Sequence, residues 1–374
     1  MSSCLIIAGE KSGEEHAMSF FPELRKLCPD TQFFGVGGED LKAQGVEILY
    51  HLKDFSSMGF SEVIGKVPFY FKALKHLEKE VLRRGTKTAI LIDFQDFNLR
   101  LAQRLSKRGV KVLYYVAPQA WVWKPGRAAI LSRTVHTLFA ILPFETKWFK
   151  DRGVNQVRSI PHPLMLTYKN QFAAIPAKPF GIWKKDKLKM LVLPGSRKFE
   201  IQLLLPIFIK TIQILRKLYP LEVHLVKVAH IPDHFYSYFK DAVDVWHEST
   251  ELVKAMNTCH VCLAASGTVT VSTGLFELPT LVAYRGSLLN EFIYNQFVKY
   301  QGPISITNMV HGKSVFPEFI QNQVDAERFA RVISSWIDNE TVYNDLKATL
   351  KETKNLLSGE QFSVPQYMSR VIHE

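Results

Sequence analysis

Apolar runs of strand length alternate with amphipathic segments through the first 120 residues. The runs are apolar at successive positions, which is typical of strands buried on both faces of a parallel sheet that helices cover. The expected strands are Leu5–Ala8, Gln32–Val36, Ala89–Ile92 and Val110–Val116, and the expected helices are Glu14–Leu27 and Leu99–Arg108. In such sheets, ligands bind beside the carboxyl ends of the strands, where the loops gather.

A second series of the same kind begins after a proline-rich segment. Pro161, Pro163, Pro176 and Pro179 interrupt the periodicity ahead of a lysine-rich patch at 184–189. The expected elements beyond it are strand Met190–Leu193, helix Leu203–Lys217 and strands Glu222–Val226, Val261–Ala264 and Thr280–Tyr284. The repeated alternation predicts two similar α/β halves.

A length of 374 residues fits two domains better than one. We expect two doubly wound, Rossmann-like α/β domains that face each other across a cleft, at 1–170 and 186–340. The helical tail at 341–374 is expected to pack on the first domain or on a partner subunit, so a homodimer is one option. No apolar run reaches about 18 residues, and the N-terminus enters a strand without a signal-peptide pattern. We therefore expect a cytoplasmic protein.

The four cysteines do not form a disulfide framework. Cys259 and Cys262 lie in an apolar strand pattern without a second pair of metal ligands, so buried thiols are expected there. No Asp-x-Asp motif with flanking ligands is present either. The sequence therefore predicts no metal site.

The net charge of +12 indicates a partner with acidic groups. The charge is uneven, because no acidic residue occurs between Asp96 and Glu145. The basic residues of this stretch are Arg100, Arg104, Lys107, Arg108, Lys111, Lys124, Arg127 and Arg133. Nucleic acid is not expected, because no helix-turn-helix, zinc-finger or RNP pattern occurs. A phosphorylated substrate and an anionic membrane surface both remain open.

Two turns that follow apolar strands have the composition of anion-binding sites. The turn 194–197 follows the strand at 190–193 and precedes a helix, where free N–H groups and an arginine fork can hold phosphate oxygens. The turn 266–268 follows the strand at 261–264 in the same way. The candidate residues are Gly195, Ser196, Arg197, Ser266, Gly267 and Thr268. An ordinary turn with a solvated arginine explains the first motif equally well, but two such turns in one α/β unit favour a nucleoside diphosphate.

The segment 63–77 mixes large apolar and aromatic residues with lysines. Such a mixture is typical of helices that lie in a membrane interface. A core-facing helix with lysines along its edge is the alternative interpretation. We favour a lipid and membrane patch made of Met58, Val63, Val67, Phe69, Phe71, Leu74, Lys66 and Lys72.

An ordered series of short motifs extends from residue 5 to about residue 321. The motifs are Ala8–Gly13, Met58–Val63, Ile92–Asn98, Pro118–Trp123, Leu142–Glu145, His162–Leu164, Leu193–Arg197, Ser266–Thr268, Asn308 and Pro317–Gln321. In order and spacing they resemble the lipid-A-disaccharide synthases, inverting glycosyltransferases of GT-B fold. Three positions depart from that pattern: Glu14 replaces an aspartate, Phe94-Gln95 replaces a pair such as Ala-Pro, and Ser272 replaces a ribose-binding glutamate.

The resemblance implies a reaction and a location. UDP-2,3-diacylglucosamine would condense with 2,3-diacylglucosamine 1-phosphate to give the β-1′,6-linked lipid A disaccharide 1-phosphate and UDP, without a cofactor. The protein would be cytoplasmic and peripheral on the anionic inner face of the inner membrane of a Gram-negative bacterium. Two alternatives stay open: another UDP-sugar enzyme of GT-B fold, such as an epimerase, and a non-catalytic lipid-binding paralogue.

Transfer of a sugar to a hydroxyl needs a base near the acceptor oxygen and positive charge near the leaving diphosphate. Asp93 and Asp96 follow the strand at 89–92 and are candidate bases, although Asp96 alternatively caps the next helix. Glu10 and His16 near the first turn are further catalytic candidates, with a structural role as the alternative for His16. On the donor side, the resemblance adds Ser12, Ser272 and Asn308.

Overall fold

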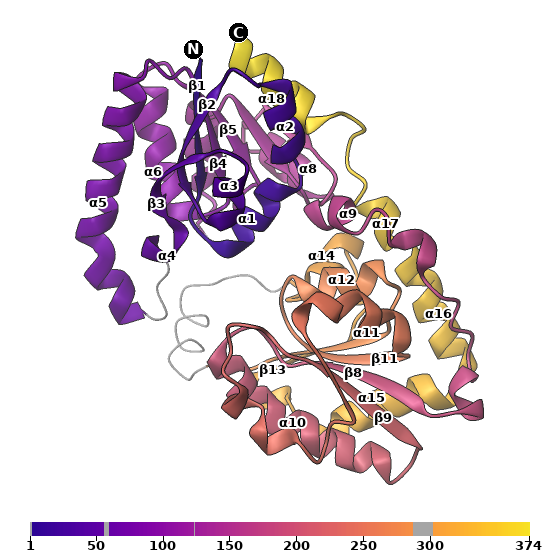
Figure 1. Cartoon of the computed structure of the whole chain (residues 1–374). Coiled ribbons are helices and arrows are strands. Elements are labelled where there is room, and N and C mark those ends of the chain that lie inside the picture. The colour runs from indigo at the N-terminus through magenta and orange to yellow at the C-terminus, as the bar shows by residue number, and fades with distance from the viewer. Residues whose placement is uncertain (1, 56–59, 123, 287–301) are drawn as a thin grey trace. The chain divides into compact units, whose positions relative to one another are not determined.

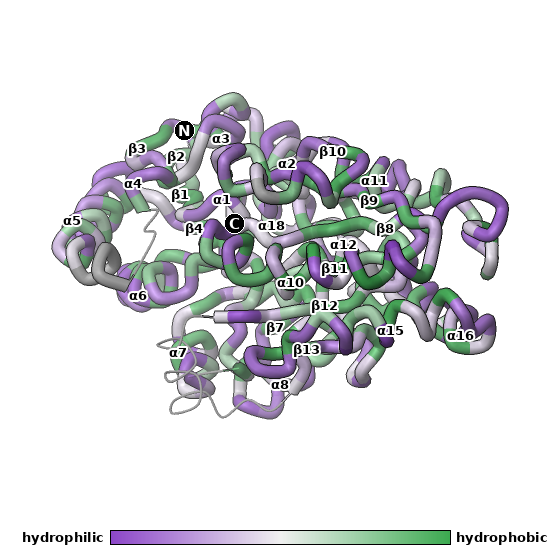
Figure 2. Tube along the Cα trace, turned by 90° about the horizontal axis from the view of Figure 1, so that it is seen from below, coloured by the Kyte–Doolittle hydropathy of each residue, from purple (hydrophilic) through white to green (hydrophobic). Residues whose placement is uncertain are grey.

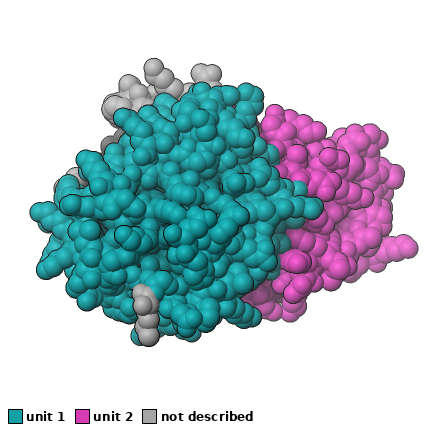
Figure 3. Space-filling model, turned by 90° about the horizontal axis from the view of Figure 1, so that it is seen from above, with its two compact units in different colours: residues 1–167, 357–374 teal, residues 168–356 magenta. Residues whose placement is uncertain are grey.

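The computed structural model describes residues 2–55, 60–122, 124–286 and 302–374, with the side chains of 60–64 and 238 left aside. The chain forms two compact units (Figure 3). Unit 1 contains Met1–Thr167 and Leu357–Glu374, and unit 2 contains Tyr168–Leu356. The C-terminal helical segment is thus divided between the two units.

Unit 1 is built on a parallel seven-stranded sheet in the order β3-β2-β1-β4-β5-β6-β7 (Figure 1). The strands are β1 Ser3–Ala8, β2 Gln32–Gly37, β3 Glu47–His51, β4 Thr88–Ile92, β5 Lys111–Tyr115, β6 Thr137–Ala140 and β7 Val157–Ser159. The chain winds outward from β1 to one edge and then from β4 to the other, as in a doubly wound sheet.

Helices cover both faces of this sheet, because the strand side chains alternate between two cores. Leu5 and Ile7 of β1 pack with α5, α6 and α7, whereas Cys4 and Ile6 pack with α1, α2 and α18. The helices are α1 Lys11–Met18, α2 Phe21–Leu27, α3 Glu39–Ala43, α4 Leu52–Phe55, α5 Phe60–Arg83, α6 Gln95–Ser106, α7 Arg127–Thr134, α8 Glu145–Lys150, α9 Pro163–Thr167 and α18 Val364–His373. The C-terminal helix α18 lies beside α2 (Figure 1).

One predicted helix is divided in two. The pattern predicts a single helix at 14–27, whereas α1 ends at Met18 and α2 begins at Phe21. Pro22 in the first turn of α2 has no N–H, and its ring would clash with the carbonyl four residues earlier, which favours a break before this point. The other predicted helices are present, and α6 and α10 each begin about one turn earlier than the pattern predicts.

Unit 2 repeats the architecture with a parallel six-stranded sheet in the order β10-β9-β8-β11-β12-β13. The strands are β8 Leu188–Leu193, β9 Leu221–Val226, β10 Val245–His247, β11 Val261–Ala265, β12 Thr280–Tyr284 and β13 Glu318–Ile320. The helices are α10 Lys198–Arg216, α11 Leu252–Thr258, α12 Val269–Leu275, α14 Ile306–His311, α15 Ala326–Asp338, α16 Glu340–Lys351 and α17 Thr353–Leu356. Figure 2 shows the central strand β8 as a hydrophobic segment, in agreement with its predicted burial. Among the described residues, no helix is both long and apolar enough to cross a bilayer.

The strand order reverses at the centre of each sheet, between two neighbouring strands. In unit 1, Ala8 at the end of β1 pairs with Ile92 at the end of β4. In unit 2, Leu193 at the end of β8 pairs with Ala264 of β11. Loops that follow such a pair open a crevice at the carboxyl edge of the sheet, where ligands of doubly wound sheets bind. The predicted catalytic and donor-site residues follow these four strands, except Asn308, which lies on α14 after β12.

Glu14 joins α1 to α3 through a buried carboxylate. One carboxylate oxygen accepts hydrogen bonds from the N–H of Gly38 at 2.7 Å and of Leu41 at 3.1 Å. We predict that Glu14→Ala lowers the free energy of unfolding by about 2–3 kcal/mol, because two N–H groups lose a charged acceptor. Urea denaturation of the Ala and Gln variants checks this, since Gln keeps one acceptor oxygen. A loss in Glu14→Gln as large as in Glu14→Ala would contradict the role of the hydrogen bonds.

Candidate functional site

Asp93 directly follows β4 and has a left-handed backbone conformation. Its φ is 47°, and that of Phe94 is 45°. The Asp93 carbonyl oxygen accepts hydrogen bonds from the Tyr114 hydroxyl at 2.9 Å and from the Asn98 amide at 2.8 Å. A left-handed non-glycine residue costs about 1–3 kcal/mol and persists only where its surroundings hold it. These contacts therefore hold the Asp93 backbone in this conformation at the edge of the sheet.

The surroundings of the Asp93 carboxyl group disfavour its negative charge. Burial and the nearby charge of Glu10 raise the pKa of Asp93 to about 6, although a hydrogen bond from the Phe94 backbone opposes the shift. A carboxylate with this pKa is ionised at neutral pH and accepts a proton more readily than an ordinary aspartate. Asp93 and Glu10 come from the paired strands β4 and β1, and together with His16 on α1 we name them the β1–β4 site.

Asp96 has a different environment. It is the second residue of α6 and its side chain is 65% exposed. A nitrogen of the buried Arg127 guanidinium lies 2.6 Å from its carboxylate, and the Lys124 ammonium lies 3.8 Å away. The alternative prediction that Asp96 caps the helix is wrong, since Phe94 is the N-cap residue. The Asp96 carboxylate is already engaged by Arg127, so the geometry favours Asp93 as the base.

Two histidines of unit 1 are neutral. Burial lowers the pKa of His16 to about 4, and burial together with the charge of His16 lowers the pKa of His162 to about 3. The N–H of Leu164 donates to His162 Nδ1 at 3.2 Å, which leaves the ring proton on Nε2. His162 belongs to one of the motifs that carry the family resemblance, although no role was predicted for it. Ser12 is exposed in the first turn of α1, in unit 1.

A cluster of aromatic rings adjoins Asp93. The ring of Phe94 covers Gly9, where a Cβ atom would lie only 2.5 Å from it. The same ring lies 5.6 Å from Phe55 and 6.3 Å from Tyr70, both in T-shaped geometry. The departure from the family pattern at Phe94 therefore places an additional aromatic ring beside the candidate base.

In unit 2, the first predicted anion-binding turn already holds a carboxylate. Glu200 is buried, and its Oε2 accepts hydrogen bonds from the N–H of Ser196 at 3.2 Å and of Arg197 at 3.3 Å. Gly195 has a φ of 111°, and a Cβ there would lie 2.6 Å from the same carboxylate. The Ser196 amide thus already has a protein acceptor, and its contact with a ligand stays a prediction. The Arg197 guanidinium remains 68% exposed, with one nitrogen 3.2 Å from Glu200.

The second turn lies next to the first, since β11 neighbours β8. The Ser266 N–H donates to the Ala283 carbonyl at 2.9 Å, so this amide is also engaged. Within the described ranges, the N–H groups of Gly267 and Thr268 donate to no protein acceptor. We name Arg197 and these two N–H groups the β8–β11 site. It is electropositive and suited to an anion.

Tyr284, at the end of β12, also belongs to this edge of unit 2. Burial and the charge of Glu200 raise the pKa of Tyr284, while the charge of Arg197 lowers it. Tyr284 is therefore near both groups. It was not among the predicted site residues, although its position at the end of an apolar strand was a usable signal.

Comparison with known families decides the assignment. A family model described as lipid-A-disaccharide synthetase matches residues 4–372. The chain belongs to the lipid-A-disaccharide synthetase family. A lipid-A-disaccharide synthase of Myxococcus xanthus is 34% identical over 340 residues, which cover 89% of this chain and 88% of the relative. One of Geobacter sulfurreducens is 31% identical over 357 residues, with 94% and 92% covered. The chain is therefore an enzyme, a glycosyltransferase of a lipid A biosynthesis family.

Solved structures identify the fold. The UDP-GlcNAc 2-epimerase from Neisseria meningitidis bound to UDP-GlcNAc superposes with a TM-score of 0.58 at 10% identity, covering 100% of both chains. The S. aureus MnaA–UDP structure gives a TM-score of 0.62 at 13% identity and covers 100% of this chain and 98% of its own. The fold of this lipid-A-disaccharide synthetase family member is GT-B, as predicted.

Two donor-side residues predicted for this family member are structural. Ser272 is buried, with its hydroxyl 3.2 Å from that of Tyr168. Asn308 is buried as well: its amide donates to the Phe316 carbonyl at 2.8 Å and to Glu318 at 2.6 Å, and its oxygen accepts two backbone N–H groups. Their hydrogen-bonding groups are used inside unit 2, so the prediction of direct donor contacts is not supported at either residue.

The predicted membrane patch of this family member is only partly exposed. Phe71 is 45% and Val67 40% exposed on α5, and Lys72 is exposed. Leu74 is 2% exposed inside the core and was wrongly assigned to the patch, whereas Phe69 is half-buried against that core and its place in the patch stays a prediction. Lys66 donates to the Asp54 carbonyl at 3.0 Å. Met58 lies outside the described residues, and of Val63 only the backbone is described.

Metal ligands do not gather in the described part of the chain. No group of three or more His, Cys, Asp or Glu side chains there could hold a metal ion. Cys259 and Cys262 are buried free thiols, which confirms the prediction from their apolar surroundings.

Proposed function

We propose that this enzyme condenses UDP-2,3-diacylglucosamine with 2,3-diacylglucosamine 1-phosphate. The products are the β-1′,6-linked lipid A disaccharide 1-phosphate and UDP. Asp93 carries the proposal: a carboxylate at the switch point of unit 1, with its backbone held by Tyr114 and Asn98 and its pKa raised to about 6. Such a group is suited to deprotonate a sugar hydroxyl at neutral pH.

In the proposed reaction, Asp93 takes the proton of the acceptor 6-hydroxyl as its oxygen attacks the anomeric carbon of the donor. The bond between that carbon and the diphosphate oxygen breaks, and UDP leaves from the opposite face, which inverts the configuration. The proton ends on the Asp93 carboxyl group. Arg197 and the N–H groups of Gly267 and Thr268 stabilise the charge that develops on the leaving diphosphate.

The surroundings of Asp93 support an acylated substrate. The half-buried rings of Phe94 and Tyr70, packed on the core residue Phe55, lie near the base, and aromatic side chains suit hydrocarbon chains. The exposed Val67 and Phe71 of α5 support peripheral attachment to the inner face of the inner membrane.

An assay with both lipid substrates tests the proposal. Purified protein in neutral detergent micelles is expected to form the disaccharide 1-phosphate, identified by mass spectrometry, with one UDP released per disaccharide. Conversion of UDP-N-acetylglucosamine to an epimer without disaccharide formation would show an epimerase instead. Binding of the lipids without any turnover would show a non-catalytic paralogue.

The pKa of Asp93 predicts the pH dependence. Because the base must be ionised, kcat/KM is expected to fall tenfold per pH unit as the pH drops below about 6. A base at His16, whose pKa burial lowers to about 4, would move this limb to about pH 4. Initial rates in buffers of constant ionic strength separate the two. A limb near pH 4 would show that Asp93 is not the base.

A further inference from the structure

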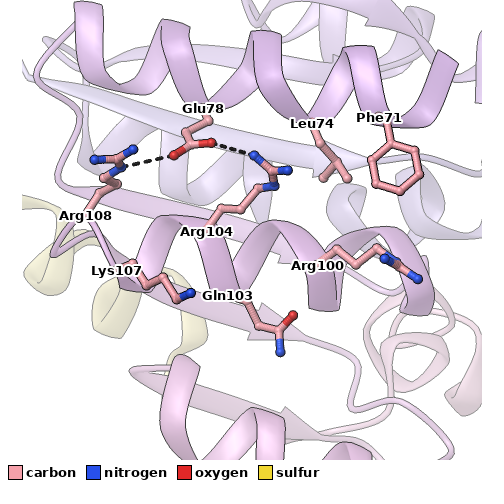
Figure 4. A pocket seen from close by; sticks show the side chains of 8 residues that line it. All are labelled: Phe71, Leu74, Glu78, Arg100, Gln103, Arg104, Lys107 and Arg108. Carbon is pink, nitrogen blue, oxygen red and sulfur yellow. Dashed lines mark hydrogen bonds and ion pairs between the residues drawn. The ribbon is translucent and has the colours of Figure 1, made fainter. Parts of the chain in front are cut away.

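The basic residues of the acid-free stretch 97–144 lie in at least two places. Four of them line a groove of about 580 Å³ between α5 and α6 (Figure 4): Arg100, Arg104, Lys107 and Arg108. Arg127 and Lys124 lie instead beside Asp96, at 2.6 and 3.8 Å from its carboxylate. Asp96 is only three residues after Asp93. The loop 116–126, which carries Lys124 and leads to α7, therefore lies beside the β1–β4 site.

This loop is held at the carboxyl edge of the sheet at both ends. At its start, the N–H of Asp93 donates to the Tyr115 carbonyl at 3.0 Å, and the next residue, Val116, has a φ of 66°. At its end, Lys124 has a φ of 57°. A β-branched residue in the left-handed region is strained, and such strain persists only where the surrounding structure holds it. The turn at 118–122 thus lies between two contacts with the segment that carries Asp93.

Trp121 belongs to this turn and is fixed by a buried carboxylate. Its indole N–H donates to Glu145 Oε1 at 3.1 Å, and its ring meets that of Phe144 edge-to-face, with 4.9 Å between the centroids. Glu145 is buried, and its Oε2 accepts hydrogen bonds from the N–H of Ile141 at 3.1 Å and of Leu142 at 3.0 Å. The Trp121 side chain is only half-buried. Glu145 therefore holds one edge of the indole while part of the side chain stays exposed.

We propose that the indole of Trp121 stacks on the glucosamine ring of the acceptor, and that Glu145 is the positioning residue that fixes the indole. The assignment rests on the proposed function, which places the acceptor hydroxyl at Asp93. The C–H groups of a pyranose form an apolar face that packs on an aromatic ring. An indole that is already fixed provides this contact with little further loss of side-chain entropy.

Steady-state kinetics in neutral micelles at saturating donor test the stacking contact. Trp121→Leu is expected to raise the acceptor KM roughly five- to thirtyfold and to change kcat less than about threefold, because the contact is made in the ground state and the transition state alike. Trp148→Leu is the matched control. Trp148 is also half-buried in unit 1, but the Arg152 guanidinium lies over its ring at 4.0 Å. Its substitution should change the acceptor KM less than about twofold, and an equal rise in both variants would overturn the proposal.

The role of Glu145 is tested through its coupling to Trp121. In Glu145→Gln, a single acceptor oxygen faces three N–H donors, so the acceptor KM is expected to rise roughly three- to tenfold. Trp121→Phe removes the same hydrogen bond while keeping an aromatic ring, and a similar rise is expected. In that background, Glu145→Gln should change the acceptor KM less than about twofold. Equal losses in both backgrounds would show a purely structural glutamate. An unchanged acceptor KM in Trp121→Phe would overturn the proposal even if the leucine variant does not fold.

Acceptor binding separates this inference from the proposed reaction. Calorimetry without donor compares the parent with Trp121→Leu, using 2,3-diacylglucosamine 1-phosphate with short acyl chains, and a second titration uses UDP. We expect the acceptor Kd to rise roughly five- to thirtyfold and the UDP Kd to stay within about twofold, because the proposed UDP contacts belong to unit 2. A parent that binds the acceptor without turnover refutes the reaction, while the two Kd values still decide the role of Trp121. A parent that turns over, with KM and Kd unchanged in Trp121→Leu, overturns the stacking contact alone, and a parent that binds no acceptor overturns both.

Discussion

Asp93→Asn is expected to lower turnover by on the order of 10²- to 10⁴-fold with the fold intact. The amide cannot take the acceptor proton, whereas asparagine tolerates the left-handed backbone as well as aspartate does. The hydrogen bonds of Tyr114 and Asn98 go to the backbone carbonyl and survive the change. Single-turnover rates with both lipid substrates measure the loss. Asp96→Asn is the matched control and should retain far more activity, because Arg127 pairs with that carboxylate.

The same variant should be more stable than the parent at neutral pH. The folded-state pKa of Asp93 is raised, so its favourable contribution to folding is complete below its unfolded-state pKa and is lost as the pH rises through about 6. Removing the charge at pH 7.5 is expected to add about 1–3 kcal/mol to the free energy of unfolding, and much less at pH 4. Thermal midpoints at both pH values test the sign. Near-normal turnover without added stability would assign the base to His16 or Asp96.

The central strands and the parallel, doubly wound arrangement were accessible to sequence reasoning for a physical reason, whereas the shorter strands β3, β6, β7, β10 and β13 and the order of the strands in each sheet were not predicted. Strands such as 89–92 and 190–193 are buried on both faces, and continuous apolar runs of that length, bounded by polar residues, are typical of the interior of a parallel sheet. Once each strand is placed in the parallel sheet of its own unit, the residues that follow the strands of that sheet must gather at its carboxyl edge. Asp93 and Arg197 were therefore found without knowledge of their contacts.

The wrong or unsupported predictions have two causes. Some residues contact segments that are distant in sequence, and others lie on a helix whose buried face was not known from the sequence. Ser272 looked available for a nucleotide, but its hydroxyl is next to that of Tyr168, more than 100 residues away. Asn308 likewise serves Glu318 and the 315–316 backbone. Leu74 and Phe71 alternate with lysines in the same way, and only the position of α5 on the sheet determines which of the two is buried.

Glu200 shows a different limit. Its spacing three residues after Arg197 is that of a capping box, which is visible in the sequence, yet the same turn also has the composition of a phosphate site. Composition alone cannot decide between an internal and an external anion. In the structure the internal carboxylate takes the Ser196 and Arg197 amides, so binding of a diphosphate at this turn depends on the Arg197 guanidinium.

Arg197→Ala is therefore expected to weaken UDP binding by about 1.5–3 kcal/mol, roughly ten- to 150-fold in Kd. The side chain is 68% exposed and its contact with Glu200 engages a single nitrogen, which leaves the rest of the guanidinium for phosphate oxygens. Isothermal titration calorimetry with UDP measures the change.

Two further variants distinguish the effect of the planar Arg197 guanidinium geometry on UDP affinity from the effect of its positive charge. Lys210→Ala removes a positive charge from the same helix and should leave UDP affinity within about twofold, because an exposed charge more than a Debye length away is screened. Arg197→Lys keeps the charge but loses the planar fork, so an intermediate affinity is expected. If Arg197→Ala and Lys210→Ala bind UDP equally well, Arg197 does not hold the diphosphate. The N–H groups of Gly267 and Thr268 would then be the remaining candidates of the β8–β11 site, because the Ser196 and Ser266 amides already have protein acceptors.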